Sequence, residues 1–415
     1  MSNYINELLT MSKGVRRFIA SESLLGISIG LFILVFNLHL LELGINEAQI
    51  GEITSIGTLV IGILAVPSGL LANRFGRKRL LVSGLFLMGI GYGGFGISEQ
   101  YLTLLFFQII TSIGITLLIT SEIQLLFYYS RSKKEETQAF SLLFAIFTLF
   151  TGVGTLLGGF LPKWIVTGNT TYQSSLFVSA VLLFLVTFIR GVLLPKEDMK
   201  LINRQTVFSL KKIIIQFNNK RLWILAFFTF IIGSAFAFVN PFQNIIVKFR
   251  LGWDDGMVSI FLTISGLFLF VGSIIMPYLL DRLGFRRTYL LTFVGNFLLS
   301  VILFFVLPVP LFAVLLLIRG GSFVMLNNLV DSQTMQATSE EDRNLFAGMR
   351  SVTRSLGSAI ANFTAGIILA EKNYFLPFLI SGLILLAGYL YFIFMVQPLL
   401  EEKQQNEAII EISPV

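Results

Sequence analysis

The sequence has no cysteine, a single histidine, and charged side chains at only 13% of its positions. Without cysteine, the chain forms no disulfide and offers no thiolate ligand to a metal. Soluble proteins carry about 25% charged residues, whereas this chain combines its low charge with 55% apolar residues. These scarcities exclude a soluble globular protein and indicate a chain that lies in a membrane.

Sequence motifs of common enzyme classes are also missing. The chain has no P-loop, no His-Glu-x-x-His sequence and no nucleophile elbow, so we expect no enzymatic activity, no cofactor and no bound metal. The run Gly89–Gly94 fits G-x-G-x-x-G, but no strand precedes it, and its small residues favour close helix packing instead. Residues 1–17 lack a cleavable signal pattern, so we expect the first apolar span to act as the targeting signal.

Twelve apolar runs are each long enough to cross a bilayer, which requires about 20 mostly apolar residues. In the first half of the chain they cover 16–41, 49–72, 80–98, 102–128, 138–162 and 172–194. In the second half they cover 221–247, 256–280, 288–307, 309–335, 345–370 and 374–397.

The Lys and Arg residues are distributed unequally between the two sides of these spans. Of the 30, we assign 23, including Arg190, to loops on the side of the N-terminus and 4 to the opposite loops. Three more, Arg319, Arg350 and Arg354, fall inside spans. Because Lys and Arg collect on the cytoplasmic side of membrane proteins, both termini are predicted to be cytoplasmic. The net charge of +7 therefore reflects membrane topology and predicts no nucleic-acid partner.

A basic turn with glycines, Gly69–Leu81, separates the second and third spans and has a second copy downstream at Pro277–Arg287. A constant shift of 208 residues pairs Gly76 with Gly284. Glycine allows the chain to reverse tightly, because it adopts backbone angles that other residues avoid. A duplicated membrane half is typical of secondary transporters.

Both turns resemble the signature of loop 2–3 in the major facilitator superfamily, Gly-x-Leu-x-Asp-Arg-x-Gly-Arg-Arg, and its echo in loop 8–9. The resemblance covers almost the whole chain. It implies an all-α integral membrane protein with twelve transmembrane helices in two pseudo-symmetric six-helix bundles. Asn73 stands where the family has an acidic residue, so the implied latch onto a helix N-terminus lacks its charge here, whereas Asp281 keeps it. The implied conformational-switch residues are Gly69, Asn73, Arg74, Gly76, Arg77, Lys78, Asp281, Arg282, Gly284 and Arg286.

We expect four parts along the chain: an N-terminal six-helix bundle (1–194), a cytoplasmic linker (195–220), a C-terminal six-helix bundle (221–397) and a cytoplasmic tail (398–415). Within the linker, 207–217 has the pattern of an amphipathic helix on the inner leaflet, which serves as a tether or as a site for a regulatory partner. We expect the protein to be a monomer in the cell membrane.

Two carboxylates lie inside spans that the resemblance assigns to the walls of a central cavity. Glu22 is in the first span and Glu122 in the fourth, which runs the opposite way, so both fall at similar depth in the inner third of the bilayer. Charged groups in a bilayer are costly and therefore functional candidates. Two acids that face one cavity are suited to binding a proton or attracting a cation. The structural alternative pairs Glu122 with Arg74 or Arg77, and Glu22 with Arg350 or Arg354.

Arg319 lies about ten residues from the outer end of the tenth span, too deep to reach water easily. It needs either an anionic ligand in the cavity or a fixed ion pair, because an unpaired buried charge is costly. One turn apart on that span, Asn327 and Asp331 point towards the inner mouth, although Asp331 also fits a charge at the helix end.

Other polar side chains on the spans assigned to the cavity are candidates for substrate contact. In the seventh span, Pro241 bends the helix, and the segment around it is either a substrate contact, an outer hinge or a packed kink. The candidates are Asn37, Gln108, Asn240, Gln243, Asn244 and Asn327.

The fifth span contains Gly154-Thr155-Leu156-Leu157-Gly158-Gly159, which looks like the Gly-Pro-x-x-Gly-Gly motif of antiporters in the family, with Thr155 in place of proline. Together with the two carboxylates and a phenylalanine-rich seventh span, it favours export of small amphipathic or aromatic compounds coupled to protons or another ion. The alternatives are uptake of a small polar or anionic nutrient, with Arg319 as the anion contact, and a lipid translocase or a receptor that does not transport.

Overall fold

A computed structural model of the chain describes residues 11–165, 168–197 and 219–402. The amphipathic helix expected at 207–217 and most of the expected tail (398–415) lie outside these residues. The described helices are α2 (Lys13–Glu42), α3 (Glu47–Phe75), α4 (Arg77–Ile97), α5 (Tyr101–Tyr129), α6 (Lys133–Trp164), α7 (Gln173–Leu193), α10 (Lys220–Ala237), η1 (Asn240–Phe242), α11 (Gln243–Leu251), α12 (Asp255–Phe304), α13 (Val309–Ala337), α14 (Arg343–Ala370), α15 (Leu376–Tyr391) and η2 (Phe392–Val396).

Eleven helices in the described part are long and apolar enough to cross a membrane. The longest of them, α12, is interrupted at Gly284, where φ is 73° and ψ is 166°. Because an α-helix does not continue through these angles, α12 contains two spans, and the total becomes the twelve that the sequence predicts. The described residues form no strand, so the predicted all-α fold is confirmed.

The two glycines that the duplication pairs adopt the same unusual backbone. Gly76, between α3 and α4, has a φ of 92°, and Gly284 has a φ of 73°. Residues with a side chain are strained at these angles, so both turns require glycine. The same backbone conformation therefore recurs at the 208-residue spacing of the sequence repeat.

The chain forms two compact units. Unit 1 comprises Met1–Thr206 and Asn244–Gly266, and unit 2 comprises Val207–Gln243 and Leu267–Val415. The segment Asn244–Gly266 belongs to unit 1 through contacts such as the hydrogen bond from Thr263 Oγ1 to the carbonyl of Gly152, at 3.1 Å.

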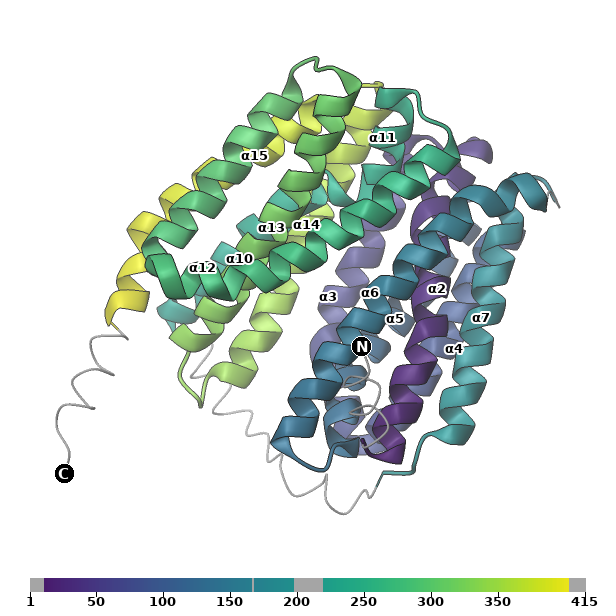
Figure 1. Ribbon diagram of the computed structural model, residues 1–415, viewed down its shortest axis with the longest axis horizontal. Helices are drawn as coiled ribbons and strands as arrows, with labels where there is room; N and C mark the ends of the chain where they lie inside the picture. The colour runs from purple at the N-terminus through teal and green to yellow at the C-terminus, as the bar shows by residue number, and fades with distance from the viewer. Residues whose placement is uncertain (1–10, 166–167, 198–218, 403–415) are drawn as a thin grey trace, which may run out of the picture. The chain divides into compact units, whose positions relative to one another are not determined.

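In unit 1, α2 packs against α6 and α7, α4 packs against α5 and α7, and α3 packs against α5. These helices run from purple to teal in Figure 1. The contact of α6 with α2 is close because Gly154 has no side chain: a Cβ built there would overlap the carbonyl oxygen of Ile27. The Gly-x-x-x-Gly spacing predicts this close approach.

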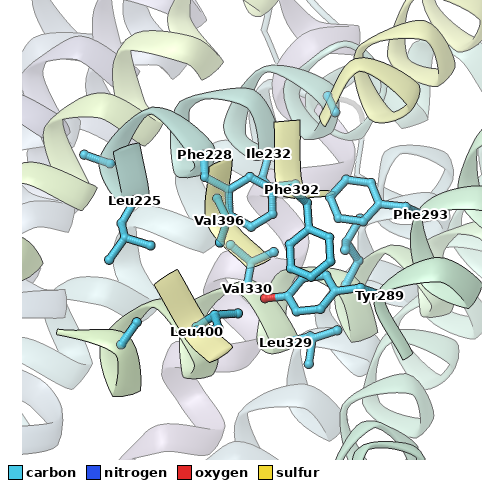
Figure 2. Close-up of a cluster of buried hydrophobic side chains, with 14 of the residues drawn as sticks. Leu225, Phe228, Ile232, Tyr289, Phe293, Leu329, Val330, Phe392, Val396 and Leu400 are labelled. Carbon is cyan, nitrogen blue, oxygen red and sulfur yellow. The ribbon is translucent and has the colours of Figure 1, made fainter. Parts of the chain in front are cut away.

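In unit 2, α10 packs against α14 and α15. An aromatic cluster forms its core (Figure 2), in which the rings of Tyr289 and Phe392 stack 3.9 Å apart. Phe228 and Phe293 lie beside them and are fully buried. Phe228 therefore belongs to the packed core of this unit and does not line an apolar cavity, although it lies in the phenylalanine-rich seventh span.

Candidate functional site

Three helices of unit 1 bring charged side chains together inside the bundle. The guanidinium of Arg190 (α7) forms ion pairs with Glu22 (α2) and, at 3.3 Å, with Glu122 (α5). Its Nε donates a hydrogen bond of 3.0 Å to the hydroxyl of Ser21, and the ring of Phe18 lies 4.5 Å from the guanidinium carbon. We call Arg190, Glu22 and Glu122 the Arg190 cluster.

The Arg190 cluster is almost free of solvent. Arg190 is fully buried, Glu22 is 1% exposed, and the side chain of Glu122 is 17% exposed. One guanidinium faces two carboxylates, so the cluster carries a net charge of −1 when both acids are ionised. An uncompensated buried charge is costly, and one bound proton makes the cluster neutral. The arrangement is therefore suited to taking up and releasing a proton.

The structure corrects the expected partners of the two acids. Glu22 and Glu122 come together as their depths suggest, but both pair with Arg190 and with none of the arginines considered from the sequence. Arg190 was assigned to a cytoplasmic loop, and this assignment is wrong, because it lies inside α7. The available signal was its position within the apolar run 172–194, where a cation needs an acidic partner.

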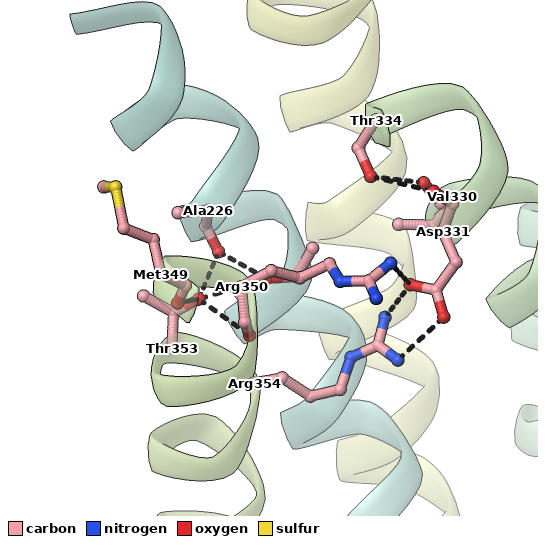
Figure 3. A network of polar contacts seen from close by, with 9 residues as sticks. Ala226, Val330, Asp331, Thr334, Met349, Arg350, Thr353 and Arg354 are labelled. Carbon is pink, nitrogen blue, oxygen red and sulfur yellow. Dashed lines mark hydrogen bonds and ion pairs between the residues drawn. The ribbon is translucent and has the colours of Figure 1, made fainter. Parts of the chain in front are cut away.

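Unit 2 contains a charged cluster with the opposite ratio of acids to arginines, shown in Figure 3. Asp331 (α13) forms ion pairs with Arg350, at 3.2 Å, and with Arg354, whose Nη1 donates to Oδ2 at 3.1 Å. All three side chains are partly buried, and the cluster carries a net charge of +1. Asp331 is thus not an isolated charge at a helix end. Asn327, one turn earlier on α13, is half-buried.

Arg319 (α13) is 95% buried, and its hydrogen-bond partners are two serine hydroxyl groups. Its Nε donates to Ser300 Oγ at 2.8 Å, and its Nη2 donates to Ser381 Oγ at 2.7 Å. The ring of Phe378 lies 5.7 Å from the guanidinium carbon. No carboxylate in the described part of the chain forms an ion pair with it, so hydroxyl groups and rings surround this cation.

The polar segment of the seventh span is divided by a short 3₁₀ turn. Asn240 lies in this turn and is exposed, Gln243 is half-buried, and Asn244 at the start of α11 is buried. Asn244 accepts a hydrogen bond of 3.0 Å from Asn37 and donates one of 2.9 Å to the carbonyl of Leu34. The turn therefore places Asn240 and Asn244 in different surroundings, although an unbroken helix would place them on one face.

The remaining candidates make local contacts. Gln108 donates a long hydrogen bond, 3.4 Å, to Ser112 on its own helix. In the first basic turn, Arg77 donates to the carbonyl of Gln124, and Asn73 and Gly69 are half-buried, whereas Arg74 is exposed.

The second basic turn lies in unit 2. Arg286 forms an ion pair of 2.6 Å with Glu401, and the guanidinium of Arg282 lies over the ring of Tyr278. Asp281 is exposed. Both turns therefore contact other helices of their own unit.

The comparisons with known proteins agree with this architecture. The model of the Major Facilitator Superfamily matches residues 19–362 and, in a second alignment, 225–411. The chain is 22% identical over 350 residues to the multidrug efflux protein YfmO of Bacillus subtilis (strain 168), which covers 84% of each chain. It is 22% identical over 392 residues to the quinolone resistance protein NorA of Staphylococcus aureus (strain MRSA252), which covers 92% of this chain and 96% of that protein.

Among solved structures, the fold is similar to that of the nucleoside transporter NupG. The TM-score is 0.76 at 14% identity, over 91% of this chain and 98% of that one. At this identity the likeness extends to the fold alone.

Proposed function

The chain belongs to the Major Facilitator Superfamily of membrane transporters, and on that premise we propose that it exports small amphipathic or aromatic compounds in exchange for protons, by alternating access. The observation that carries the proposal is the Arg190 cluster, in which one cation faces two buried carboxylates. Export is supported by the names of similar proteins, which are a multidrug efflux protein and a quinolone resistance protein.

Coupling follows from the charge of the cluster. If Glu22 or Glu122 binds a proton, the cluster is neutral and stable in a low-dielectric environment. If the proton leaves, the charge of one carboxylate is uncompensated. This charge favours a different packing of the helices that carry the cluster, or it attracts a cationic substrate. Glu122 retains some exposure, so it is the acid through which we expect the proton to enter.

The test uses proteoliposomes with an imposed pH difference and two probes, ethidium and a fluoroquinolone. We expect Glu122→Gln to abolish probe movement driven by the pH difference, because the neutral amide cannot release a proton. The matched control is Glu340→Gln, which changes an exposed carboxylate in unit 2. Unchanged proton-driven transport by a folded Glu122→Gln protein would contradict the proposed coupling.

A second candidate function is uptake of a small anionic nutrient, and Arg319 is the observation that favours it. This buried cation lacks a carboxylate partner in the described part of the chain, so an anionic ligand would compensate its charge. Lysine retains the charge but cannot form two parallel hydrogen bonds. Normal uptake of an anionic substrate by Arg319→Lys would argue against a bidentate contact.

The remaining features of the proposal concern the arrangement in the membrane. We place both termini in the cytoplasm, two six-helix halves at 1–194 and 221–397, and one chain in the working transporter. The charge distribution supports this orientation.

A further inference from the structure

A pocket of about 560 Å³ lies outside the Arg190 cluster, where α4 begins and α7 ends. One end of it is lined by Lys78, Arg79, Lys196 and Glu197, and the other end includes Val82 and Phe86. Its size is within the range of about 300–1,000 Å³ that small-molecule sites occupy. The pocket thus combines a charged end with an apolar wall.

The charged end is built for an anion that also carries a hydrogen-bond donor. Its three cations and one carboxylate give a net charge of +2. Lys78 is held in place, because its Nζ donates to the carbonyl of Leu194 at 2.6 Å and its backbone N–H donates to Glu197 Oε2 at 2.7 Å. The other oxygen of Glu197, Oε1, is buried and has no hydrogen-bond partner among the described residues. Glu197 itself lines the pocket, so its carboxylate can accept a hydrogen bond from a ligand hydroxyl.

The apolar end faces away from the helical bundle. Phe86 is 48% exposed, and Val82 is half-buried one turn before it on α4. In a membrane, such exposed apolar side chains contact hydrocarbon. The ligand that fits both ends is therefore an amphiphile with an anionic head and a hydrocarbon tail.

We propose that this pocket binds one anionic glycerophospholipid of the phosphatidylglycerol type. The phosphate lies against Arg79 and Lys196, a headgroup hydroxyl donates to Glu197, and an acyl chain follows Val82 and Phe86. Basic pockets between transmembrane helices on the cytoplasmic side are suited to anionic headgroups. The assignment to the inner leaflet rests on the proposed orientation of the termini.

The site has a consequence for conformational change. Gly76 and Lys78 line the pocket and belong to the basic turn between α3 and α4, which the family resemblance marks as a conformational switch. A bound lipid adds contacts between this turn and the end of α7. It therefore favours the state in which those elements are together, by the difference in its affinity for the two states.

The experiment compares the binding of phosphatidylglycerol, phosphatidylcholine and inorganic phosphate to the purified full-length protein by native mass spectrometry and thermal shift. The variant is Arg79→Gln with Lys196→Gln, two exposed residues of the pocket. The control is Lys133→Gln with Lys134→Gln, two exposed residues of the other basic loop in unit 1 with the same change of charge. Because the pocket variant lacks two cations, we expect it to bind phosphatidylglycerol ~30-fold more weakly. We expect the control to bind phosphatidylglycerol as the unmodified protein does.

Three results would overturn the proposal. Equal loss in the pocket variant and the control would mean that phosphatidylglycerol responds to general surface charge. Equal stabilisation by inorganic phosphate would mean that the pocket is an anion site without a role for the acyl chain. Unchanged binding by a Val82→Trp variant, in which a bulky side chain fills the apolar end, would place the lipid elsewhere. The pocket is separate from the Arg190 cluster, so these results leave the test of proton coupling independent.

Discussion

Arg190 and Asp331 have opposite roles in the charge balance of their units. In unit 1 one arginine forms ion pairs with two acids, and in unit 2 one acid forms ion pairs with two arginines. Neither cluster is neutral when all its members are ionised. A buried ion pair is itself weak evidence for stability, so we interpret the incomplete compensation, and not the pairing, as the functional feature.

Removing Arg190 tests how far unit 1 depends on this cation. Arg190→Met leaves two buried carboxylates without a partner, and we expect it to lower the free energy of unfolding by about 3–5 kcal/mol. The measurement is unfolding in mixed micelles, followed by circular dichroism. The triple variant Arg190→Met, Glu22→Gln, Glu122→Gln has no buried charge left in the cluster and should recover much of the loss. If the single variant is as stable as the triple one, the cluster does not carry the uncompensated charge that we infer.

Asp254, in the loop before α12, is expected to give stability a small dependence on pH. Its carboxylate accepts a hydrogen bond of 2.9 Å from Lys163 and another from the backbone of Met257, and these contacts hold the pKa of Asp254 below its usual value. A depressed pKa contributes stability above the unfolded pKa, and this contribution is lost as the pH falls through the folded pKa. The window therefore lies below about pH 4.

We expect Asp254→Asn to lower the melting temperature slightly at pH 7 and by less at pH 3. The shift is small because both partners are more than half exposed. Thermal unfolding of the two proteins across this pH range provides the measurement. An equal shift at both pH values would mean that the charge of Asp254 is not responsible.

At the scale of elements, the contact between α2 and α6 depends on the absence of a side chain at Gly154. In Gly154→Ala the new methyl group meets the backbone of Ile27, so the helices must separate. We expect a loss of about 1–3 kcal/mol in the free energy of unfolding, as for other overpacked interiors. Gly266→Ala in α12 is the control, because a Cβ there meets nothing within 4 Å. That change should be neutral or should stabilise the helix by about 0.5–1 kcal/mol, and an equal loss in both variants would contradict the close-packing account.

The sequence predicts the elements well because the bilayer imposes a simple requirement. Each span needs about 20 apolar residues, and every run found in this way corresponds to one candidate membrane span of the structure or to one side of the break at Gly284. Local detail within a span is harder to predict. Pro241 indicates a bend, but the 3₁₀ turn that separates the exposed Asn240 from the buried Asn244 depends on how the surrounding helices pack.

At the scale of the whole molecule, the sequence predicts how deep in the membrane a residue lies better than it predicts which neighbouring helix its side chain faces. Glu22 and Glu122 could be brought together from their positions along two spans, because each residue advances a helix by 1.5 Å. Whether the side chain of Arg190 points towards these two acids depends on the rotation of α7 about its own axis. The hydrophobic pattern of a membrane helix does not fix that rotation, because lipid and protein interior are both apolar. The position of Arg190 in the apolar run 172–194 indicates that it needs an acidic partner, but only the structure identifies Glu22 and Glu122 as its partners.

The orientation of the molecule in the membrane can be tested directly, because the natural chain has no cysteine to interfere with labelling. Single cysteines replace the exposed residues Glu99 and Glu371 in two loops of the predicted outer side, and Lys133 and Glu340 in two loops of the predicted inner side. A maleimide that does not cross membranes is applied to intact cells, and again after lysis.

We expect Glu99→Cys and Glu371→Cys to be labelled in intact cells, and Lys133→Cys and Glu340→Cys only after lysis. Each half of the molecule contributes one loop to each side, so the four variants test the orientation of the two halves separately. The reverse pattern would place the basic turns outside, against the tendency of Lys and Arg to remain in the cytoplasm. It would also place the proposed lipid pocket at the outer leaflet and bring the Arg190 cluster closer to the outer surface, so the leaflet proposed for the lipid depends on this result, whereas lipid binding itself does not.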